Sequence, residues 1–346
     1  MSDFIGTKLT MNLGERSYDI IVKRSSLENL YQFARLDRRV AVVTDSGVPA
    51  QYAQMVADQC KDATIITVPQ GEASKSFKIL ETVLRQMLDF GMGRGDLVVA
   101  VGGGVVGDLA GFAASIYMRG IDFINCPTTT LSMIDSSIGG KTAVDLGDTK
   151  NIVGAFWQPK LVIVDPDTLS TLPRRHFING LAEAVKAGLL ADPELFSIFE
   201  KEDVDDRIGD IICRSLRFKK SIVEQDETEQ GMRKALNFGH TIGHGIEAVK
   251  GIRGRRTTGL YHGECVALGM LPMIEDPALV KRVRAIYRTL GLPTRTGANK
   301  AKVLEYMQHD KKTRGDSITV IKCSGLGCWR ADTLPTTELA HLLGAE

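Results

Sequence analysis

The first half of the sequence alternates short apolar runs with segments of helical periodicity. The apolar runs are rich in β-branched residues: RVAVVTD (39–45), TIITVP (64–69), LVVAVGGG (97–104), FINCP (123–127) and LVIVD (161–165). Between them lie segments such as SFKILETVLRQMLDFG (76–91), where apolar residues recur at helical spacing. This rhythm predicts a parallel sheet with helices on both faces. Before it, LTMNL and YDIIVK flank GER and predict a hairpin.

The pattern changes near residue 170. Beyond TLPRRHF nearly every segment has helical periodicity, until SITVIKCSGLGCWR (317–330), which predicts a small hairpin. A length of 346 residues also favours two domains. We therefore predict an α/β N-terminal domain over residues 1–172 and a mostly α-helical C-terminal domain over residues 173–346.

The balance of charges indicates no general affinity for nucleic acid or membranes. Lys and Arg number 43 against 42 Asp and Glu, so an anion site must be a local cluster of charge. The six cysteines form no C-x-x-C pair, and free thiols are expected, although Cys323 and Cys328 could face each other across a hairpin. The N-terminus is too polar for a signal peptide, and no apolar run reaches membrane-spanning length. These features predict a cytoplasmic protein.

A glycine cluster follows one of the predicted strands. In VAVGGGVVGDLAGF, Gly102, Gly104 and Gly107 satisfy G-x-G-x-x-G and open a predicted helix. This context favours a Rossmann-like dinucleotide site, because the helix N-terminus offers N–H groups to a pyrophosphate. Asp108 could cap the helix or reach a ribose. The alternative is a tight strand-to-helix turn without a ligand.

The stretch IDSSIGGKTAVD (134–145) resembles the end of an ATP-binding phosphate loop. That loop requires G-x-x-x-x-G-K-[ST], and its first glycine would be residue 135, which is aspartate. A carboxylate there would repel a triphosphate, so we do not expect a nucleotide triphosphatase. Lys141 remains a candidate for binding another anion. Its small, apolar and hydroxyl neighbours indicate a tucked-in loop and weaken the alternative of a solvated lysine.

Three histidines and one acid form a candidate metal site. LNFGHTIGHGIEAV places His240 and His244 on one helix face, and His262 begins a later helical run. Upstream, the apolar helix NGLAEAVKAGLL carries Glu183 and Lys186. A carboxylate with two imidazoles and open positions is typical of a catalytic divalent site such as Zn²⁺. The alternatives are packed histidines and a simple Glu183–Lys186 ion pair, and spacing leaves open whether His244 is a ligand or an acid–base group.

Several cationic residues flank these motifs in a chain whose net charge is only +1: Arg119, Lys150, Lys186, Lys219, Arg233 and Lys311. If they converge, the ligand is polyanionic. Taken singly, each would be an ordinary solvated side chain.

The motifs together resemble the 3-dehydroquinate synthase family, within the sugar-phosphate cyclase group. The resemblance covers nearly the whole chain and is strongest in GGGVVGDLAGF (102–112), YMRG (117–120), PTTTLSMIDSSIGGKTAV (127–144), KNIVGAFWQP (150–159), GLAEAVKAG (180–188), LNFGHTIGH (236–244) and HGECVALGM (262–270). It implies a bound NAD⁺ and a divalent metal, Zn²⁺ or Co²⁺. The implied metal ligands are Glu183, His240 and His262, which leaves His244 as a polar group beside the substrate.

The resemblance also assigns cofactor and substrate residues. Implied cofactor contacts are Asp45, Glu72, Lys75, Gly103, Gly104, Val105, Asp108, Thr128, Thr129, Leu131, Asp135, Lys150, Thr171 and Leu172. Implied contacts to the substrate's carboxylate and phosphate are Lys141, Asn151, Lys186, Lys219, Arg233, Asn237 and Lys311, with Lys312 as an alternative to Lys311. Asp135 would face the reacting carbons, and Arg119 would reach the phosphate site of a neighbouring subunit in a homodimer.

The implied reaction belongs to the shikimate pathway of aromatic amino acid biosynthesis. A seven-carbon keto-acid phosphate, 3-deoxy-D-arabino-heptulosonate 7-phosphate, is oxidised by NAD⁺, loses phosphate by β-elimination and is reduced again. Ring opening and an internal aldol closure then give 3-dehydroquinate. The departing phosphate itself could take the proton, which would explain why no strong protein base stands out.

Some positions depart from the family pattern, and three rival functions follow. Gly47 and Thr149 replace residues common in the family, and the loop 251–260 is long and carries Arg253, Arg255 and Arg256. We expect a solvated insertion there, with a lid over the substrate as the alternative.

The rival functions are a sister cyclase acting on glucose 6-phosphate or a heptulose phosphate, a metal-dependent polyol dehydrogenase, and a non-catalytic NAD-binding regulator. The intact Gly-Gly-Lys-Thr loop and Asn237 favour the dehydroquinate reaction.

Overall fold

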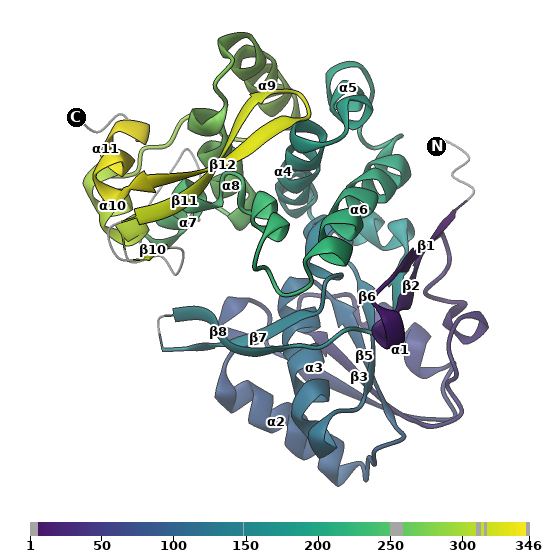
Figure 1. The fold of residues 1–346 in the computed structure, drawn as a ribbon. Helices are drawn as coiled ribbons and strands as arrows, with labels where there is room; N and C mark the ends of the chain where they lie inside the picture. Colours follow the sequence, from purple (N-terminus) through teal and green to yellow (C-terminus); the bar gives the residue numbers. More distant parts are fainter. Residues whose placement is uncertain (1–5, 148, 250–258, 309–312, 315–316, 344–346) are drawn as a thin grey trace. The chain divides into compact units, whose positions relative to one another are not determined.

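The computed structural model describes residues 6–147, 149–249, 259–308, 313–314 and 317–343 (Figure 1). The chain forms two compact units: Met1–Phe177 with Ile208–Lys220, and Ile178–Arg207 with Ser221–Glu346. Within the described ranges, none of the helices combines the length and the apolar character that a membrane span requires.

A seven-stranded sheet forms the centre of the first unit (Figure 1). In spatial order its strands are β1 (Thr7–Met11), β2 (Tyr18–Val22), β9 (Leu161–Val164), β6 (Asp122–Pro127), β5 (Leu97–Gly102), β3 (Arg39–Asp45) and β4 (Asp62–Val68). The β1–β2 hairpin is antiparallel, and every other neighbouring pair is parallel. The predicted hairpin and mostly parallel sheet are therefore confirmed.

Each face of this sheet carries its own apolar core. On β3, Val40 and Val42 belong to the core that includes α1 (Ala50–Ala57). Ala41 and Val43 belong to the opposite core, which includes α2 (Phe77–Asp89) and α3 (Gly104–Ile116). Alternate residues of a strand face opposite sides, so a sheet covered on both faces needs continuous apolar strands. This explains the uninterrupted apolar runs of the sequence.

A second, two-stranded sheet packs against α3 in the same unit. It consists of β7 (Lys141–Leu146) and β8 (Thr149–Phe156), which pair in antiparallel register. The motif at Lys141, expected only as a ligand-binding loop, is thus also the start of a hairpin. The alternation in KTAVDL is the sequence signal that indicates this strand.

The second unit is mostly helical, as predicted. Its helices are the main part of α4 (Arg174–Leu190), α5 (Pro193–Lys201), the end of α6 (Ile208–Gln225), α7 (His240–Ala248), α8 (His262–Met270), α9 (Pro277–Leu290), α10 (Lys300–Gln308) and α11 (Leu339–Leu342). A three-stranded sheet of β10 (Thr313–Arg314), β11 (Ser317–Gly325) and β12 (Cys328–Pro335) contains the predicted hairpin.

The cysteines are free, as expected. The register of β11 and β12 pairs Cys323 with Trp329 and Gly325 with Cys328, so the two thiols do not face each other. Cys323 is buried, Cys328 is exposed, and all six cysteines lack a disulfide partner.

The core between α3 and the sheet supports the first unit, and we predict that Leu109→Ala destabilises it. Leu109 is fully buried on α3, so its truncation should lower the free energy of unfolding by about 2–5 kcal/mol. Urea denaturation followed by circular dichroism measures this change. The matched control is Leu88→Ala on α2, whose side chain is exposed and whose loss should cost less than about 0.5 kcal/mol. Equal losses for the two variants would contradict this assignment of the core.

Candidate metal centre and cofactor site

Helix α4 places an ionised carboxylate inside the second unit. Glu183 is buried, and the α4 residues on either side of it are apolar and buried. Its Oε2 pairs with Lys186 one turn later, and Lys186 Nζ also donates to the Leu236 carbonyl at 2.7 Å. Apart from this ion pair, the carboxylate oxygens have no hydrogen-bond donor in the described part of the chain. A buried carboxylate with so few donors needs further positive charge nearby.

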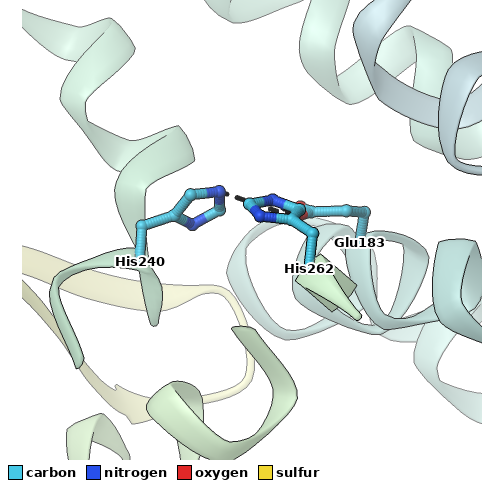
Figure 2. A group of neighbouring side chains, drawn as sticks. All are labelled: Glu183, His240 and His262. Atoms are coloured by element: carbon cyan, nitrogen blue, oxygen red, sulfur yellow. Dashed lines mark ion pairs between the residues drawn. The ribbon is translucent and has the colours of Figure 1, made fainter. Parts of the chain in front are cut away.

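Two imidazoles face the other carboxylate oxygen. Figure 2 shows His240 and Glu183 approaching from opposite sides, with His262 between them. Glu183 Oε1 lies 3.5 Å from His240 Nε2 and 3.7 Å from His262 Nε2, distances longer than good hydrogen bonds. Donor atoms about 2.0–2.1 Å from a tetrahedral zinc ion lie roughly 3.3–3.4 Å apart. The three donors therefore fit one shared divalent ion, and each lies within 4.8 Å of the others.

The other nitrogen of each ring has an oxygen partner. His240 Nδ1 lies 3.1 Å from the Phe238 carbonyl, and His262 Nδ1 lies 2.9 Å from Glu247 Oε2. Both oxygens can only accept, so each Nδ1 carries the proton and donates. Each Nε2 then carries a lone pair on the side that faces Glu183. Ligand histidines in metal proteins are oriented by partners of this kind.

The charges of these groups depend on one another. Burial would raise the pKa of Glu183, but Lys186 and His262 outweigh burial and lower this pKa to about 2. Burial would likewise lower the pKa of His262, whereas the nearby carboxylates of Glu183 and Glu247 raise it to about 10. The carboxylates thus favour positive charge between them, which a proton or a divalent cation can supply. The two compete for the same nitrogen, because a ligand imidazole must be neutral.

His244 completes a triangle of rings. Its centroid lies 5.2 Å from that of His240 and 5.8 Å from that of His262. With Glu247 and His262 it forms a second donor set that could hold an ion. Both donor sets contain His262. The contact of His262 with Glu247, at 2.9 Å, is a hydrogen bond, whereas its contact with Glu183, at 3.7 Å, is longer. The structure therefore places His244 beside the first set, and its role as a substrate-side group stays a prediction.

In the first unit, several predicted cofactor and substrate residues gather around Lys75. This lysine is only 4% exposed and donates to Asp108 Oδ2 at 2.6 Å and to Asn151 Oδ1. Glu72 lies 4.0 Å from Lys75 Nζ and 3.8 Å from Lys150 Nζ. Burial would lower the pKa of Lys75, but Asp108 and Glu72 outweigh burial and raise it. Lys75 thus stays cationic at neutral pH. Asp108 does not cap α3, whose N-cap is Gly103.

The remaining predicted cofactor residues follow the carboxyl ends of neighbouring parallel strands. Asp45 ends β3 and accepts from Gly47 N at 2.8 Å. Gly103, Gly104 and Val105 follow β5, and Thr128, Thr129 and Leu131 follow β6. Thr128 N bonds to the Gly102 carbonyl at 2.9 Å, which joins the two turns. Farther along, the Thr171 and Tyr52 hydroxyls lie 3.0 Å apart, and Leu172 comes next in the chain. Ligands of open parallel sheets bind at this edge.

Two of the predicted anion-binding lysines of the first unit, Lys219 and Lys141, differ in their surroundings. Lys219 Nζ contacts Asp135 twice, at 2.9 Å to Oδ1 and 2.7 Å to the backbone carbonyl, and Asp135 lies in a π-helical turn (Ser132–Ser136). Such turns are frequent at functional sites. Lys141 is exposed at the start of β7, although residues 138–140 before it are buried. The expectation of a tucked-in loop thus applies to those residues and is wrong for the lysine.

Arg119 occupies a strained turn. Met118 and Arg119 have φ values of 50° and 69°, in the left-handed region that such residues rarely adopt. Each costs roughly 1–3 kcal/mol, and backbone of this kind clusters at functional sites. Arg119 is exposed at this turn.

Among the anion-binding candidates of the second unit, Arg233 is fully buried and donates to the Glu227 carbonyl. Asn237 Nδ2 donates to Glu229 Oε1 at 2.8 Å. Lys311, Lys312 and residues 250–258 of the basic loop lie outside the described residues.

Two acids at these sites were not predicted from the sequence. Glu247 follows His240 and His244 by seven and three residues, so helical spacing could have indicated it. Glu229 belongs to no periodic pattern, and its φ of 62° and its bond to Asn237 appear only in the structure.

Two family models match consecutive parts of the chain. The model described as 3-dehydroquinate synthase N-terminal matches residues 65–179, and that described as 3-dehydroquinate synthase C-terminal matches residues 180–313. The 3-dehydroquinate synthase of Pelobacter propionicus is 39% identical over 360 residues, covering 98% of this chain and 99% of that protein. The 3-dehydroquinate synthase of Streptococcus mutans serotype c is 40% identical over 357 residues, covering 97% and 99%.

Solved structures of two other synthases have the same fold. A complex of 2-deoxy-scyllo-inosose synthase with carbaglucose-6-phosphate, NAD⁺ and Co²⁺ has a TM-score of 0.86 at 24% identity, covering 97% of this chain and 99% of that one. The 2-epi-5-epi-valiolone synthase of Streptomyces hygroscopicus subsp. jinggangensis, with NAD⁺ and Zn²⁺ bound, has a TM-score of 0.84 at 26% identity, covering 96% and 97%.

The contact between Glu247 and His262 predicts a measurable effect on metal affinity. Glu247→Ala removes the acceptor that fixes the ring, so affinity for Zn²⁺ or Co²⁺ should fall about 10–100-fold, measured by calorimetry on metal-depleted protein. Glu305→Ala, at an exposed position of α10, is the control and should bind as the wild type does. Unchanged affinity would show that Glu247 does not support the ring. Complete loss would instead favour Glu247 as a direct ligand.

Proposed function

Because this chain belongs to the 3-dehydroquinate synthase family, we propose that it converts 3-deoxy-D-arabino-heptulosonate 7-phosphate to 3-dehydroquinate and phosphate. It is a lyase of the shikimate pathway, and its family mechanism depends on NAD⁺ and a divalent metal. The observation that carries the proposal is the buried Glu183 carboxylate, which faces two Nε2 atoms at distances that suit three ligands of one metal ion.

We assign Glu183, His240 and His262 as ligands of Zn²⁺ or Co²⁺. One anionic and two neutral ligands leave a net positive charge and open positions, as a catalytic site requires. Lys186 pairs with the second carboxylate oxygen and so limits how the carboxylate can rotate. Phe238 and Glu247 hold the rings through their Nδ1 atoms.

When bound, NAD⁺ would take a hydride from the substrate and later return it, while the divalent ion would polarise the substrate oxygen as a Lewis acid. The chain's own cationic and amide side chains would bind and orient the anionic ends of the substrate, which keeps the reacting atoms aligned. In the first unit we assign this role to Lys141, Asn151 and Lys219, and in the second to Lys186, Arg233, Asn237 and Lys311. Asp135 would face the reacting carbons, and His244 would act as a polar group beside the substrate.

For the cofactor we propose the residues at the carboxyl edge of the sheet and around Lys75. They are Asp45, Glu72, Lys75, Gly103, Gly104, Val105, Asp108, Thr128, Thr129, Leu131, Asp135, Lys150, Thr171 and Leu172. Support comes from the strand-to-helix turn at Gly103, whose N–H groups suit a pyrophosphate. The ionised Lys75 offers a second attraction for phosphate. On this assignment residues 1–172 form the NAD-binding domain, and residues 173–346 form the metal- and substrate-binding domain.

We further propose a cytoplasmic homodimer in which Arg119 reaches the phosphate site of the neighbouring subunit. The strained, exposed backbone at Arg119 supports a role outside its own subunit. Ile116 and Met118 beside it are exposed apolar residues that an interface could cover. Free cysteines are typical of a reducing compartment.

A sister cyclase is the second candidate function. It is favoured by the likeness to 2-epi-5-epi-valiolone synthase, whose structure binds NAD⁺ and Zn²⁺. The full-length relatives near 40% identity favour the dehydroquinate reaction instead.

The most informative assay measures phosphate release from 3-deoxy-D-arabino-heptulosonate 7-phosphate. We expect release to require added Zn²⁺ or Co²⁺ after chelation and only catalytic amounts of NAD⁺, without accumulation of NADH. Glucose 6-phosphate and a heptulose phosphate are the control substrates and should release no phosphate. Turnover of either control in place of the keto-acid phosphate would indicate a sister cyclase, and stoichiometric NADH would indicate a polyol dehydrogenase.

Substitution of the proposed metal ligands should abolish turnover and leave the fold intact. Glu183→Gln and His262→Ala should each lower kcat at least about 100-fold, because metal stabilisation of the transition state is worth several kcal/mol. Circular dichroism should show wild-type helix content. His341→Ala, at an exposed position of α11, is the control and should keep full activity. Normal turnover of either ligand variant would remove the metal assignment.

A further inference from the structure

The N-terminus of α8 is capped by a side chain from α4. Asn179 Oδ1 accepts from Gly263 N at 2.7 Å and from Glu264 N at 3.3 Å. These are first-turn N–H groups, which have no acceptor within their own helix. Glu264 Oε2 in turn accepts from Tyr261 N at 3.0 Å and secures the residue before the helix. The start of α8 is therefore tied to α4 by hydrogen bonds to a single amide oxygen.

The two helices also touch closely at this point. Asn179 is buried, and a Cβ atom added to Gly263 would lie 1.9 Å from the backbone carbonyl oxygen of Asn179. Only glycine permits this approach. The start of α8 therefore cannot slide along α4 without breaking both hydrogen bonds to Asn179 Oδ1.

This cap lies directly beside the proposed metal centre. Asn179 and Glu183 are four residues apart on α4, so they share one face and are separated by about 6 Å along the axis. His262 immediately precedes Gly263, the residue that Asn179 holds. Fixing Gly263 against Asn179 therefore fixes His262 against Glu183, one helical turn farther along, where Nε2 lies 3.7 Å from the carboxylate.

We infer that Asn179 is a positioning residue of the metal centre, whose side-chain carbonyl sets the spacing between Glu183 and His262. This inference rests on the proposed metal assignment. It is distinct from the role of Glu247, which belongs to α7 and orients the His262 ring through Nδ1. Asn179 fixes the backbone that carries the ring.

The test compares Co²⁺ binding among variants of the metal-depleted chain by visible absorption titration. Asn179→Ala removes the acceptor and should weaken binding about 10–100-fold. Asn179→Asp keeps an oxygen acceptor of nearly the same shape, favourable at a helix N-terminus, and should bind within about threefold of the wild type. Asn179→Ser keeps a shorter acceptor, and its affinity for Co²⁺ should lie between those of the alanine and aspartate variants. It provides the measurement if the alanine variant folds poorly.

The matched control is Asn299→Ala. Asn299 Oδ1 caps Lys302 N at 3.2 Å at the start of α10, a helix without proposed ligands. This variant should lower the melting temperature and leave Co²⁺ affinity unchanged. If Asn179→Ala behaves like Asn299→Ala, or if Asn179→Asp binds as weakly as Asn179→Ala, the positioning role is wrong. If the wild type itself fails to bind Co²⁺, the metal assignment is wrong and this inference is wrong with it. If the wild type binds Co²⁺ and Asn179→Ala binds equally well, only the role of Asn179 is wrong.

Discussion

The second unit is organised around one buried negative charge. Removing a carboxylate from water costs several kcal/mol unless nearby cations and hydrogen bonds compensate. For Glu183 the compensation comes from Lys186 on its own helix and from the positive charge, a proton or a divalent cation, that two imidazoles carried by α7 and α8 can hold beside it. Because the apolar surface of α4 excludes water, these groups interact at low dielectric.

The groups around the Glu183 carboxylate are themselves held in place by other residues. The imidazoles face Glu183 because their Nδ1 atoms are held by Phe238 and Glu247. The helix that carries His262 is held in turn by Asn179. Among the proposed ligands, His262 is thus held both at its ring, by Glu247, and at the backbone of the next residue, by Asn179. Rigidity of this kind determines metal affinity and the orientation of a bound substrate.

Much of the fold follows from the sequence, because periodicity depends on local burial. The strands at 39–45, 97–102 and 161–164 are nearly continuous apolar runs, and the structure covers both faces of their sheet. The β7–β8 hairpin was not predicted, because its first residues belong to the Gly-Gly-Lys-Thr motif, which resembles a phosphate-binding loop. The exposure of Lys141 depends on how that hairpin packs, which no spacing in the sequence reveals.

The candidate site was only partly predictable for a similar reason. Glu183, His240 and His262 stand out because charged or imidazole groups interrupt apolar helices, and the structure brings them together. Their role as ligands stays a prediction, as do the cofactor and substrate contacts. Asn179 and Glu247 were missed because their importance arises from contacts between helices. An asparagine next to a glycine looks like an ordinary helix residue until the neighbouring helix is seen.

X-ray absorption spectroscopy of the zinc-loaded protein tests the central claim most directly, because it reports the atoms that surround the ion. We predict two imidazole ligands and oxygen ligands at about 2.0–2.1 Å, with one imidazole lost in His240→Ala. Sulfur at about 2.3 Å, or an unchanged spectrum in that variant, would contradict it.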